Sequence, residues 1–375
     1  MKEIGLYIHI PFCKRKCLYC DFNSYEAQKH DEDEYINALL HEIKKYLEQE
    51  QFIFKTVFIG GGTPTVIKFK NISKLLETIA PYIKKEAEVT MECNPGTIGK
   101  MAAKEYKTMG INRISIGLQA WQNELLKTIG RIHNCQEFLD SYYLLRNEGF
   151  KNINIDLMFS LPGQTIDMWH ETLEEVCKLN AEHISCYSLI LEESTPIYSL
   201  IKSGKLSIPD EDVDRNMYYL AKDILKNNGY SQYEISNFSK LGFECSHNLI
   251  YWRNGEYLGV GAGSHSKIGA KRFWNAGNIE QYVNAIKSDG SPILGNEDID
   301  RAEDMWETIF LGLRLNEGIN TSKFNKRYDD DFMSIYGDVV LELQKDGLVN
   351  INGKNIVLTD KGIDLSNRVF IKFSK

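Results

Sequence analysis

Three of the eight cysteines in this 375-residue chain stand within eight residues of one another, near its amino terminus. They are Cys13, Cys17 and Cys20, at the spacing C-x3-C-x2-C. Thiolates gathered on one short loop are typical ligands of a soft metal centre. A zinc site usually has four ligands, as two separated pairs or completed by histidines. Three thiolates suit a 4Fe–4S cluster with one iron open to an outside ligand. The alternative is three buried or free cysteines in a turn, without a metal.

A glycine run, Gly60–Gly62, is followed by Thr63 and Pro64 and forms a second unusual stretch. Because glycine has no Cβ, such a run lets a ligand approach the backbone closely. It matches neither the P-loop nor the G-x-G-x-x-G pattern, so a nucleotide phosphate is not the expected ligand. A plain tight turn is the alternative explanation.

A histidine and two large aromatic residues, His247, Tyr251 and Trp252, form a third stretch. An imidazole can ligate heme iron while aromatic rings pack on the macrocycle. From residue types alone, a structural loop explains His247 better. Other residues that could contact a heme are the weaker iron-ligand candidates His9 and His265 and, for the propionates, Arg253, Lys271 and Arg272. The later G-x-G-x-G has Ser264 where a dinucleotide fingerprint has glycine, which disfavours NAD.

Six apolar segments, each followed by a helical pattern, position these residues. The expected strands are residues 6–10, 56–59, 88–93, 113–118, 153–159 and 184–191. The expected helices are residues 31–49, 72–83, a segment closed by Gly110, 135–147, 166–179 and 213–227. Six such units indicate a parallel α/β fold. Periodicity alone fits a doubly wound sheet or a partial barrel, and both place the chemistry at the carboxyl ends of the strands. Cys13, Gly61, Glu92, Gln119 and Asp156 fall there.

After residue 230 the pattern changes. We expect a strand at 230–236, a glycine- and aromatic-rich stretch at 237–275, a helix at 279–288 and a polar linker at 291–300. Helices at 301–315, 321–328 and 332–345 then precede a two-stranded wing at 348–358. The expected domains are therefore residues 1–236, 237–300 and 301–375. Because the last segment lacks a basic face, it is expected to cover or dock rather than to bind DNA.

Net charge and apolar content disfavour nucleic-acid-binding, membrane-spanning and secreted proteins. A net charge of −8 and a pI near 5.6 disfavour a nucleic-acid partner. No apolar run reaches the roughly 18 residues of a membrane-spanning helix, and residues 1–5 contain no secretory signal. Cluster thiolates require a reducing compartment, so we expect a cytoplasmic protein. Peripheral association with a membrane protein is compatible with all of this.

The cysteine spacing, with Tyr19 before the last cysteine, resembles the radical S-adenosylmethionine (SAM) superfamily. The string Y-I-H-I-P-F-C at residues 7–13 resembles its oxygen-independent coproporphyrinogen III oxidase-like branch. The resemblance implies a three-quarter, TIM-like barrel of six βα units and a small, mainly helical, winged-helix-like C-terminal domain. It implies a 4Fe–4S cluster on the three cysteines, whose open iron chelates SAM. The SAM contacts it implies are Tyr7, Tyr19, Gly61, Gly62, Thr63, Glu92, Gln119, Arg131 and Asp156.

Within this branch, two features separate oxidases from chaperones. The oxidases carry a further cysteine two residues after the third, where this chain has Phe22, and they have a longer segment before the cluster. The string H-N-x-x-Y-W, complete at residues 247–252, marks the HemW heme chaperones. The resemblance thus implies a protein that binds heme and delivers it to respiratory apoproteins, with flavodoxin or ferredoxin as a potential electron donor. The alternatives are coproporphyrinogen III oxidase, acting by radical decarboxylation, or another radical SAM enzyme. Whether SAM is cleaved stays open.

Overall fold

Six parallel strands stand side by side in the order of the sequence in this computed structural model, which describes residues 2–374. They are β1 (Lys2–Ile10), β4 (Phe52–Gly61), β5 (Ile83–Cys93), β6 (Arg113–Gln119), β7 (Ile153–Phe159) and β8 (His183–Ser188). A doubly wound sheet would reverse its strand order, whereas a barrel winds in one direction. The predicted partial barrel of six βα units is therefore confirmed.

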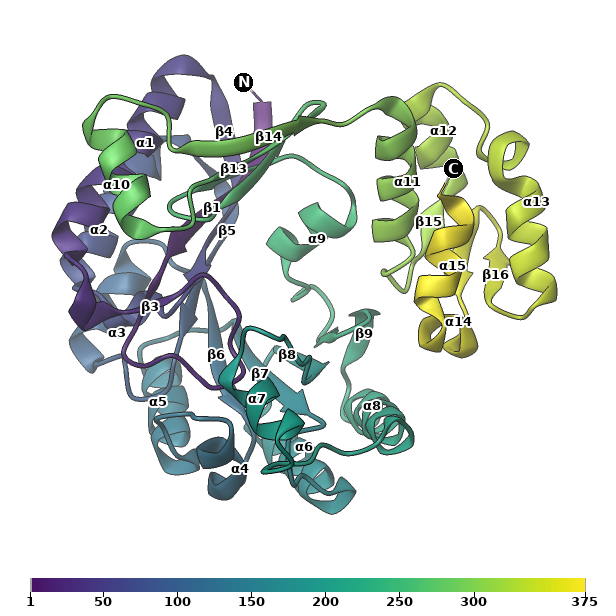
Figure 1. The fold of residues 1–375 in the computed structure, drawn as a ribbon, viewed down its shortest axis with the longest axis horizontal. Helices are drawn as coiled ribbons and strands as arrows, with labels where there is room; N and C mark the ends of the chain where they lie inside the picture. Colours follow the sequence, from purple (N-terminus) through teal and green to yellow (C-terminus); the bar gives the residue numbers. More distant parts are fainter. Residues whose placement is uncertain (1, 375) are drawn as a thin grey trace.

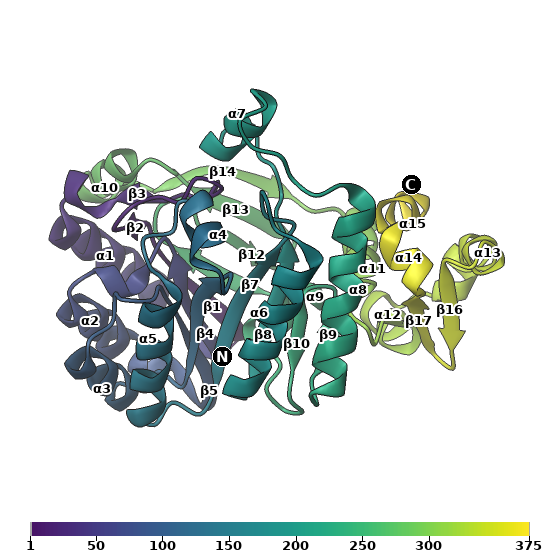
Figure 2. The same ribbon diagram turned by 90° about the horizontal axis from the view of Figure 1, so that it is seen from below.

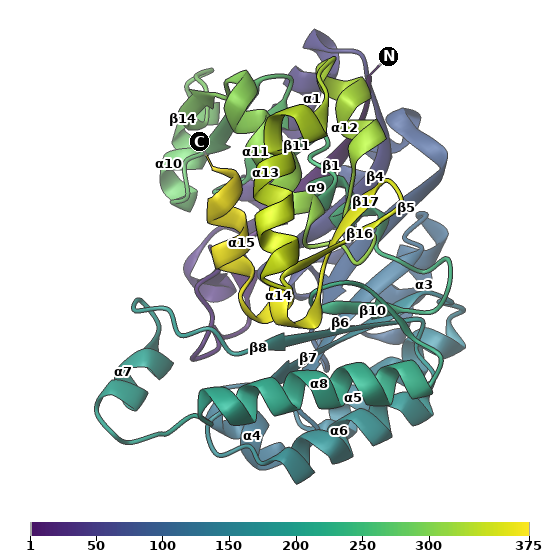
Figure 3. The same cartoon turned by 90° about the vertical axis from the view of Figure 1, so that its right-hand side faces the viewer.

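Helices cover the outer face of this curved sheet (Figures 1 and 2). They are α1 (Glu32–Gln49), α2 (Phe69–Ile79), α3 (Lys100–Thr108), α5 (Cys135–Asn147), α6 (Ile166–Leu179) and α8 (Glu211–Asn227). Side-chain caps stabilise the starts of α1, α5, α6 and α8: for example, Asp31 accepts from the backbone of Glu34, and Asn134 and Glu137 form a capping box. Two short helices were not expected: α4 (Asn123–Thr128) and α7 (Pro196–Lys202), the latter projecting from the body (Figures 2 and 3).

The sheet does not close, and further strands extend both of its edges. At one edge β11 (Tyr257–Val260) pairs in parallel with β1, and β12 (His265–Ile268), β13 (Lys271–Asn275) and β14 (Ile293–Asp298) continue in antiparallel fashion. At the other edge β10 (Asn237–Ser239) lies between β8 and β9 (Ser231–Glu234). The interpretation of residues 291–300 as a linker is wrong, because pairing with β13 makes most of them a strand.

The glycine- and aromatic-rich stretch also contains α9 (Ser246–Trp252), which lies between the barrel strands and the C-terminal helices (Figure 1). This helix packs against β1 at Gly5, where an added Cβ would lie 2.8 Å from Ile250 Cδ1 and 3.3 Å from His247 Cε1. Any larger residue there would have to displace the Ile250 side chain, so the glycine in β1 favours the close packing of this helix. The helix α10 (Ile279–Lys287) packs beside α1 on the outside.

The last part of the chain has its own apolar core. It consists of α11 (Arg301–Gly312), α12 (Thr321–Tyr328), α13 (Phe332–Lys345), α14 (Asp360–Asp364) and α15 (Ser366–Phe373), with β15 (Ile319–Asn320), β16 (Val349–Asn352) and β17 (Asn355–Leu358) in one small sheet. The expected wing is confirmed, and it turns at Gly353 with φ +62°. Among residues 2–374, no helix combines the length and apolarity needed to cross a bilayer.

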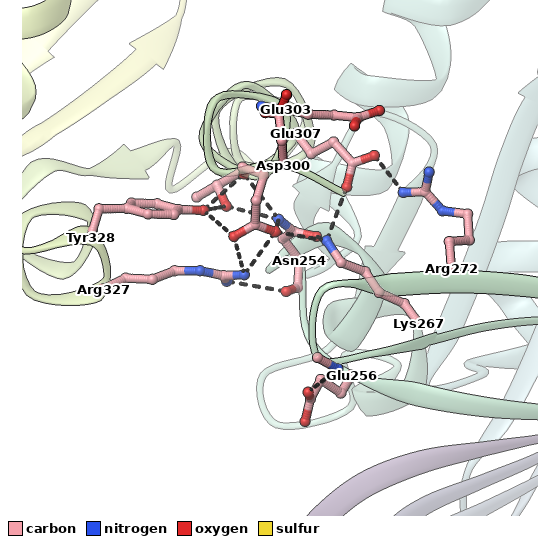
Figure 4. A network of polar contacts seen from close by, with 12 residues as sticks. Asn254, Glu256, Lys267, Arg272, Asp300, Glu303, Glu307, Arg327 and Tyr328 are labelled. Atoms are coloured by element: carbon pink, nitrogen blue, oxygen red, sulfur yellow. Dashed lines mark hydrogen bonds and ion pairs between the residues drawn. The ribbon is translucent and has the colours of Figure 1, made fainter. Parts of the chain in front are cut away.

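This C-terminal domain lies over the open side of the barrel (Figure 3) and contacts the sheet near both of its edges. At the β9 edge, Asn316 donates to the backbone of Gln232, while α8 forms the ion pairs Arg215–Asp364 and Lys222–Asp360. At the opposite edge the contact is a network of buried charges on β12, β13 and α11 (Figure 4).

Lys267 is the centre of that network. The residue is 4% exposed, and its ammonium donates to Asp304 Oδ1 and Glu307 Oε2 at 2.9 Å each, and also to Asn254. Arg272 pairs with Glu307 from the neighbouring strand. The network borders a cavity of about 600 Å³ that none of the predicted site residues lines. Because each charged side chain of the network has a partner of opposite charge, the attraction between them offsets the desolvation cost of burying the network between the sheet and α11.

Removal of the Lys267 ammonium should therefore destabilise the protein. Lys267→Met leaves Glu307 and Asp304 buried with one cation fewer, and we expect a loss of about 3 kcal/mol in the free energy of unfolding. Lys222→Met is the matched control, because its ion pair with Asp360 is solvent-exposed and should contribute less than about 1 kcal/mol. Urea unfolding followed by circular dichroism measures both values, and equal losses would contradict the expectation.

Candidate active site

A cavity of about 540 Å³ lies at the carboxyl ends of the barrel strands. It brings together nearly all the residues that the sequence predicted for cluster and SAM. Its lining includes Cys13, Cys17, Cys20, Tyr19, Gly61, Gly62, Thr63, Glu92, Gln119, Arg131 and Asp156. Tyr7 is the exception: it lines a neighbouring cavity of about 320 Å³ and contacts His9 Nδ1 through its hydroxyl at 3.0 Å. Gly61, Glu92 and Phe22 line both cavities.

The cysteine loop is fastened to the strand ends at several points. Cys13 lies in β2 (Phe12–Cys13), and Thr63 Oγ1 donates to its sulfur at 3.7 Å. Arg131 Nη1 lies 3.6 Å from Cys17 Sγ, and the Leu18 backbone N–H donates to Ile129 at 3.1 Å. Burial raises the pKa of the Cys13 and Cys20 thiols. A positive charge or a metal would stabilise the thiolate forms.

The glycine run is required by packing and is not a plain turn. Gly61 has φ +115°, and an added Cβ would lie 2.5 Å from the His9 ring. At Gly62 the added Cβ would lie 2.6 Å from the backbone oxygen of Phe12. Gly61 therefore leaves room for the His9 ring of β1, and Gly62 for the backbone of β2. The Gly61 N–H also donates to Glu92 Oε2 at 2.9 Å, which orients that carboxyl beside the cavity.

Arg131 links the cysteine loop to the strand ends, since its Nη2 donates to Asn94 Oδ1 at 2.7 Å and to the Gly117 oxygen at 2.6 Å. Gln119 has φ 73° at an irregularity in the pairing of β6 with β7, and it accepts from the Tyr187 hydroxyl at 2.9 Å. A non-glycine residue with positive φ is strained, and such strain concentrates at functional sites. The backbone of Gln119 supports its assignment to the site.

Around the predicted Asp156, the cavity is lined by four polar residues that were not predicted: Arg113, Ser115, Asn154 and Ser185. Asp156 accepts from Ser115 at 2.9 Å and from Asn154 at 2.7 Å, and Arg113 and Ser185 also line the cavity. They occupy alternate positions on buried parallel strands, which normally carry apolar residues on both faces. Polar residues at every second position of β6 and β7 were therefore the sequence signal that could have identified these cavity-lining residues.

The heme-candidate residues of α9 point in different directions. His247 is 1% exposed, its Nδ1 is 2.8 Å from Thr56 Oγ1, and its Nε2 is 2.8 Å from the Tyr251 hydroxyl. Burial lowers the pKa of His247 to about 3, so the ring is neutral. Tyr251 lines the smaller cavity, whereas Trp252 faces Arg314, whose guanidinium lies 4.9 Å from the indole centroid.

The other heme candidates divide between cavity and surface. His9 and His265 line the smaller cavity, and His265 stacks on Trp274 at 5.7 Å. The three basic residues proposed for the propionates already have carboxylate partners. Their ion pairs are Arg253–Glu317, Lys271–Asp298 and Arg272 with Glu297 and Glu307.

The environment of Glu92 predicts a pH-dependent stability. Burial raises the pKa of Glu92 from 4.5 to about 7, with the charge of Asp156 adding to the rise. The folded state therefore holds this proton more tightly, and its contribution to stability is lost as pH rises from about 4.5 to about 7. Relative to Glu92→Gln, the wild type should lose up to about 3 kcal/mol over this window. Urea unfolding on both sides of the window measures the difference, and a difference independent of pH would contradict the expectation.

Comparisons with known proteins agree with this geometry. The model of the radical SAM superfamily matches residues 7–176, and that of the HemN C-terminal domain matches residues 299–365. The chain is 38% identical to the heme chaperone HemW of Bacillus subtilis, over 98% of each chain. It is also 38% identical to that of Lactococcus lactis, over 99% of this chain and 97% of the relative.

Among solved structures, coproporphyrinogen III oxidase (HemN) from Escherichia coli has the same fold, with a TM-score of 0.86 and 24% identity. The superposition covers 99% of this chain and 90% of that chain. At this identity the similarity shows the fold alone, so the assignment rests on the sequence relatives. The chain belongs to the radical SAM superfamily and, within it, to the HemW family.

Proposed function

We propose that this protein is a heme chaperone that binds heme and delivers it to respiratory apoproteins. The observation that carries the proposal is the 38% identity with the heme chaperone HemW of Bacillus subtilis over 98% of both chains. The complete H-N-x-x-Y-W string also supports it, because this string is typical of the HemW chaperones. In the structure the string lies in α9, between the barrel strands and the C-terminal domain.

We propose that Cys13, Cys17 and Cys20 hold a 4Fe–4S cluster. Their thiols line one cavity, and Arg131 reaches Cys17 with a positive charge. Within residues 2–374, no three His, Cys, Asp or Glu side chains are spaced for one metal ion. A cluster differs from a single ion in that each thiolate binds its own iron, so this donor set fits it. When bound, the cluster supplies an open iron to the amino and carboxylate groups of SAM.

Around that position, the chain's own residues can hold SAM by ordinary polar contacts. The glycine loop leaves room beside the Glu92 carboxyl, which suits an amino group, and Arg131 suits a carboxylate. Asp156, fixed by Ser115 and Asn154, can accept from ribose hydroxyls. Tyr19 offers an aromatic face, while Gln119 and Thr63 complete the polar wall.

We propose that heme enters at the mouth shared by the two cavities. Phe22, which lines both cavities, is 67% exposed, and Ile190, which lines the larger one, is 70% exposed; such apolar residues suit a flat apolar macrocycle. His265 and Tyr251 line the smaller cavity and are accessible iron ligands. For His247 to bind iron, its ring would have to exchange the hydrogen bond with Tyr251. Trp252 then stabilises α9 from the side of the C-terminal domain.

Several further assignments belong to the same proposal. The basic residues Lys14, Arg15 and Lys16 beside the cysteines suit an acidic electron donor such as flavodoxin or ferredoxin. Residues 1–236 form the radical SAM core, 237–300 the extension with α9, and 301–375 the HemN-like domain. A cytoplasmic location, with recipients reached at the membrane surface, fits thiolate ligands that need a reducing compartment.

The ligand assignment predicts the effect of removing one thiol. Protein with Cys17→Ser, prepared without oxygen, should lose most of its iron and sulfide, because a weak hydroxyl ligand replaces a thiolate. Cys135→Ser is the matched control, since this thiol begins α5 outside the cavity and its loss should not change the iron content. Iron and sulfide analysis decides, and a full cluster in Cys17→Ser would contradict the assignment.

Hemin titration of the cluster-loaded protein tests the function itself. We expect a shift of the Soret band on binding and its loss when heme passes to an apo-cytochrome. His265→Ala and Tyr251→Phe should weaken binding about tenfold or more if either residue ligates iron. Incubation with coproporphyrinogen, SAM and a reductant should yield no protoporphyrinogen. Efficient conversion without heme transfer would replace the proposal by the oxidase function.

A further inference from the structure

A buried arginine at the wall of the larger cavity has no partner in the protein. Arg113, the first residue of β6, is 2% exposed and lines the cavity. Within residues 2–374 its side chain forms no hydrogen bond and no ion pair, and its buried Nε is unsatisfied. A buried guanidinium without a hydrogen-bond partner is unfavourable even when carboxylates lie nearby, so its retention needs an explanation.

The carboxylates near Arg113 are occupied by other donors. Glu88 and Asp156 are the acidic residues whose charges act on Arg113. Glu88 accepts from two backbone N–H groups at the start of α9, at 2.9 and 3.1 Å. Asp156 accepts from Ser115 at 2.9 Å and from Asn154 at 2.7 Å. The guanidinium is therefore left with its hydrogen-bonding capacity unused.

A second donor without a partner lies in the same cavity. Asn248, the residue after His247 in α9, lines the cavity, and its carboxamide forms no hydrogen bond with any described residue. Guanidinium and carboxamide N–H groups together match an acceptor with two oxygens and a negative charge, which describes a carboxylate. The three other cations considered for such a role are already paired with Glu or Asp.

We propose that Arg113 and Asn248 bind a carboxylate of the molecule held in the cavity. Two sources carry this group: a propionate of heme and the methionine carboxylate of SAM. The inference rests on the proposed function for the source of the carboxylate, whereas the subsite itself follows from the unpaired guanidinium. It gives Asn248, the second residue of the H-N-x-x-Y-W string, a role separate from that of His247.

The subsite can be tested with sodium propionate, without heme or SAM. At constant ionic strength, propionate should raise the melting temperature of the wild type above its value in sodium chloride. Arg113→Met replaces the guanidinium by an apolar chain, and its melting temperature in sodium chloride serves as its own reference. It should show no propionate-dependent rise. Equal responses of the two proteins would overturn the proposal.

Arg113→Lys keeps the charge but not the planar pair of donors, so its response to propionate should be intermediate. This variant also serves if Arg113→Met does not fold. The exposed Arg368→Met, on α15, is the control for non-specific attraction and should respond as the wild type does.

The source is identified by comparing hemin, hemin dimethyl ester and SAM as ligands of the full-length, cluster-loaded protein. A tenfold to hundredfold weaker binding of hemin to Arg113→Met, with no change for the ester, assigns the subsite to a propionate. The same loss for SAM assigns it to the methionine carboxylate. If the wild type binds both ligands and Arg113→Met binds them equally well, the proposed function stands and this inference is overturned.

Discussion

The absence of side chains at Gly61 and Gly62 is the constraint on which the cavity depends. A Cβ at either position would come within 2.6 Å of β2 or of the His9 ring. A side chain at Gly62 would push away β2, and with it Cys13 and the Thr63 contact, whereas one at Gly61 would displace the His9 ring. Because Glu92 is oriented by the Gly61 N–H, the same close approach also positions the acidic residue of the site. The close contacts at Gly61 and Gly62 thus position both the Cys13 thiol and the Glu92 carboxyl.

The interior of the barrel is more polar than is usual for a parallel sheet. Asp156, Asn154 and Ser115 satisfy one another, and Asn154 Oδ1 also lies 2.6 Å from His183 Nδ1. Such a network tolerates burial only when every donor and acceptor is paired. Arg113 departs from this rule, and its unpaired side chain faces the cavity. The interior is consequently organised for a ligand rather than for packing alone.

The sequence predicted the strand–helix order and the strand-end residues well, because both depend on local signals. Cysteine spacing, glycine runs and single polar residues after apolar segments are visible without tertiary contacts. The prediction failed where strand pairing determines the secondary structure. Residues 293–298 look like a polar linker, yet they form a strand because they pair with β13. Strand formation depends on neighbours as much as on residue type. The sequence also could not show that both His247 nitrogens are occupied, or that Arg113 lacks a partner, since these are properties of side-chain contacts.

The C-terminal domain bridges the two free edges of the open sheet and so acts as a brace across its gap. Any widening of this gap would load both attachments at once. The attachment through buried Lys267 is strong, whereas the one through Lys222 and Arg215 is exposed to water. If the gap widens, the water-exposed attachment is therefore the one that breaks at the lower cost in free energy, while the buried Lys267 network stays intact.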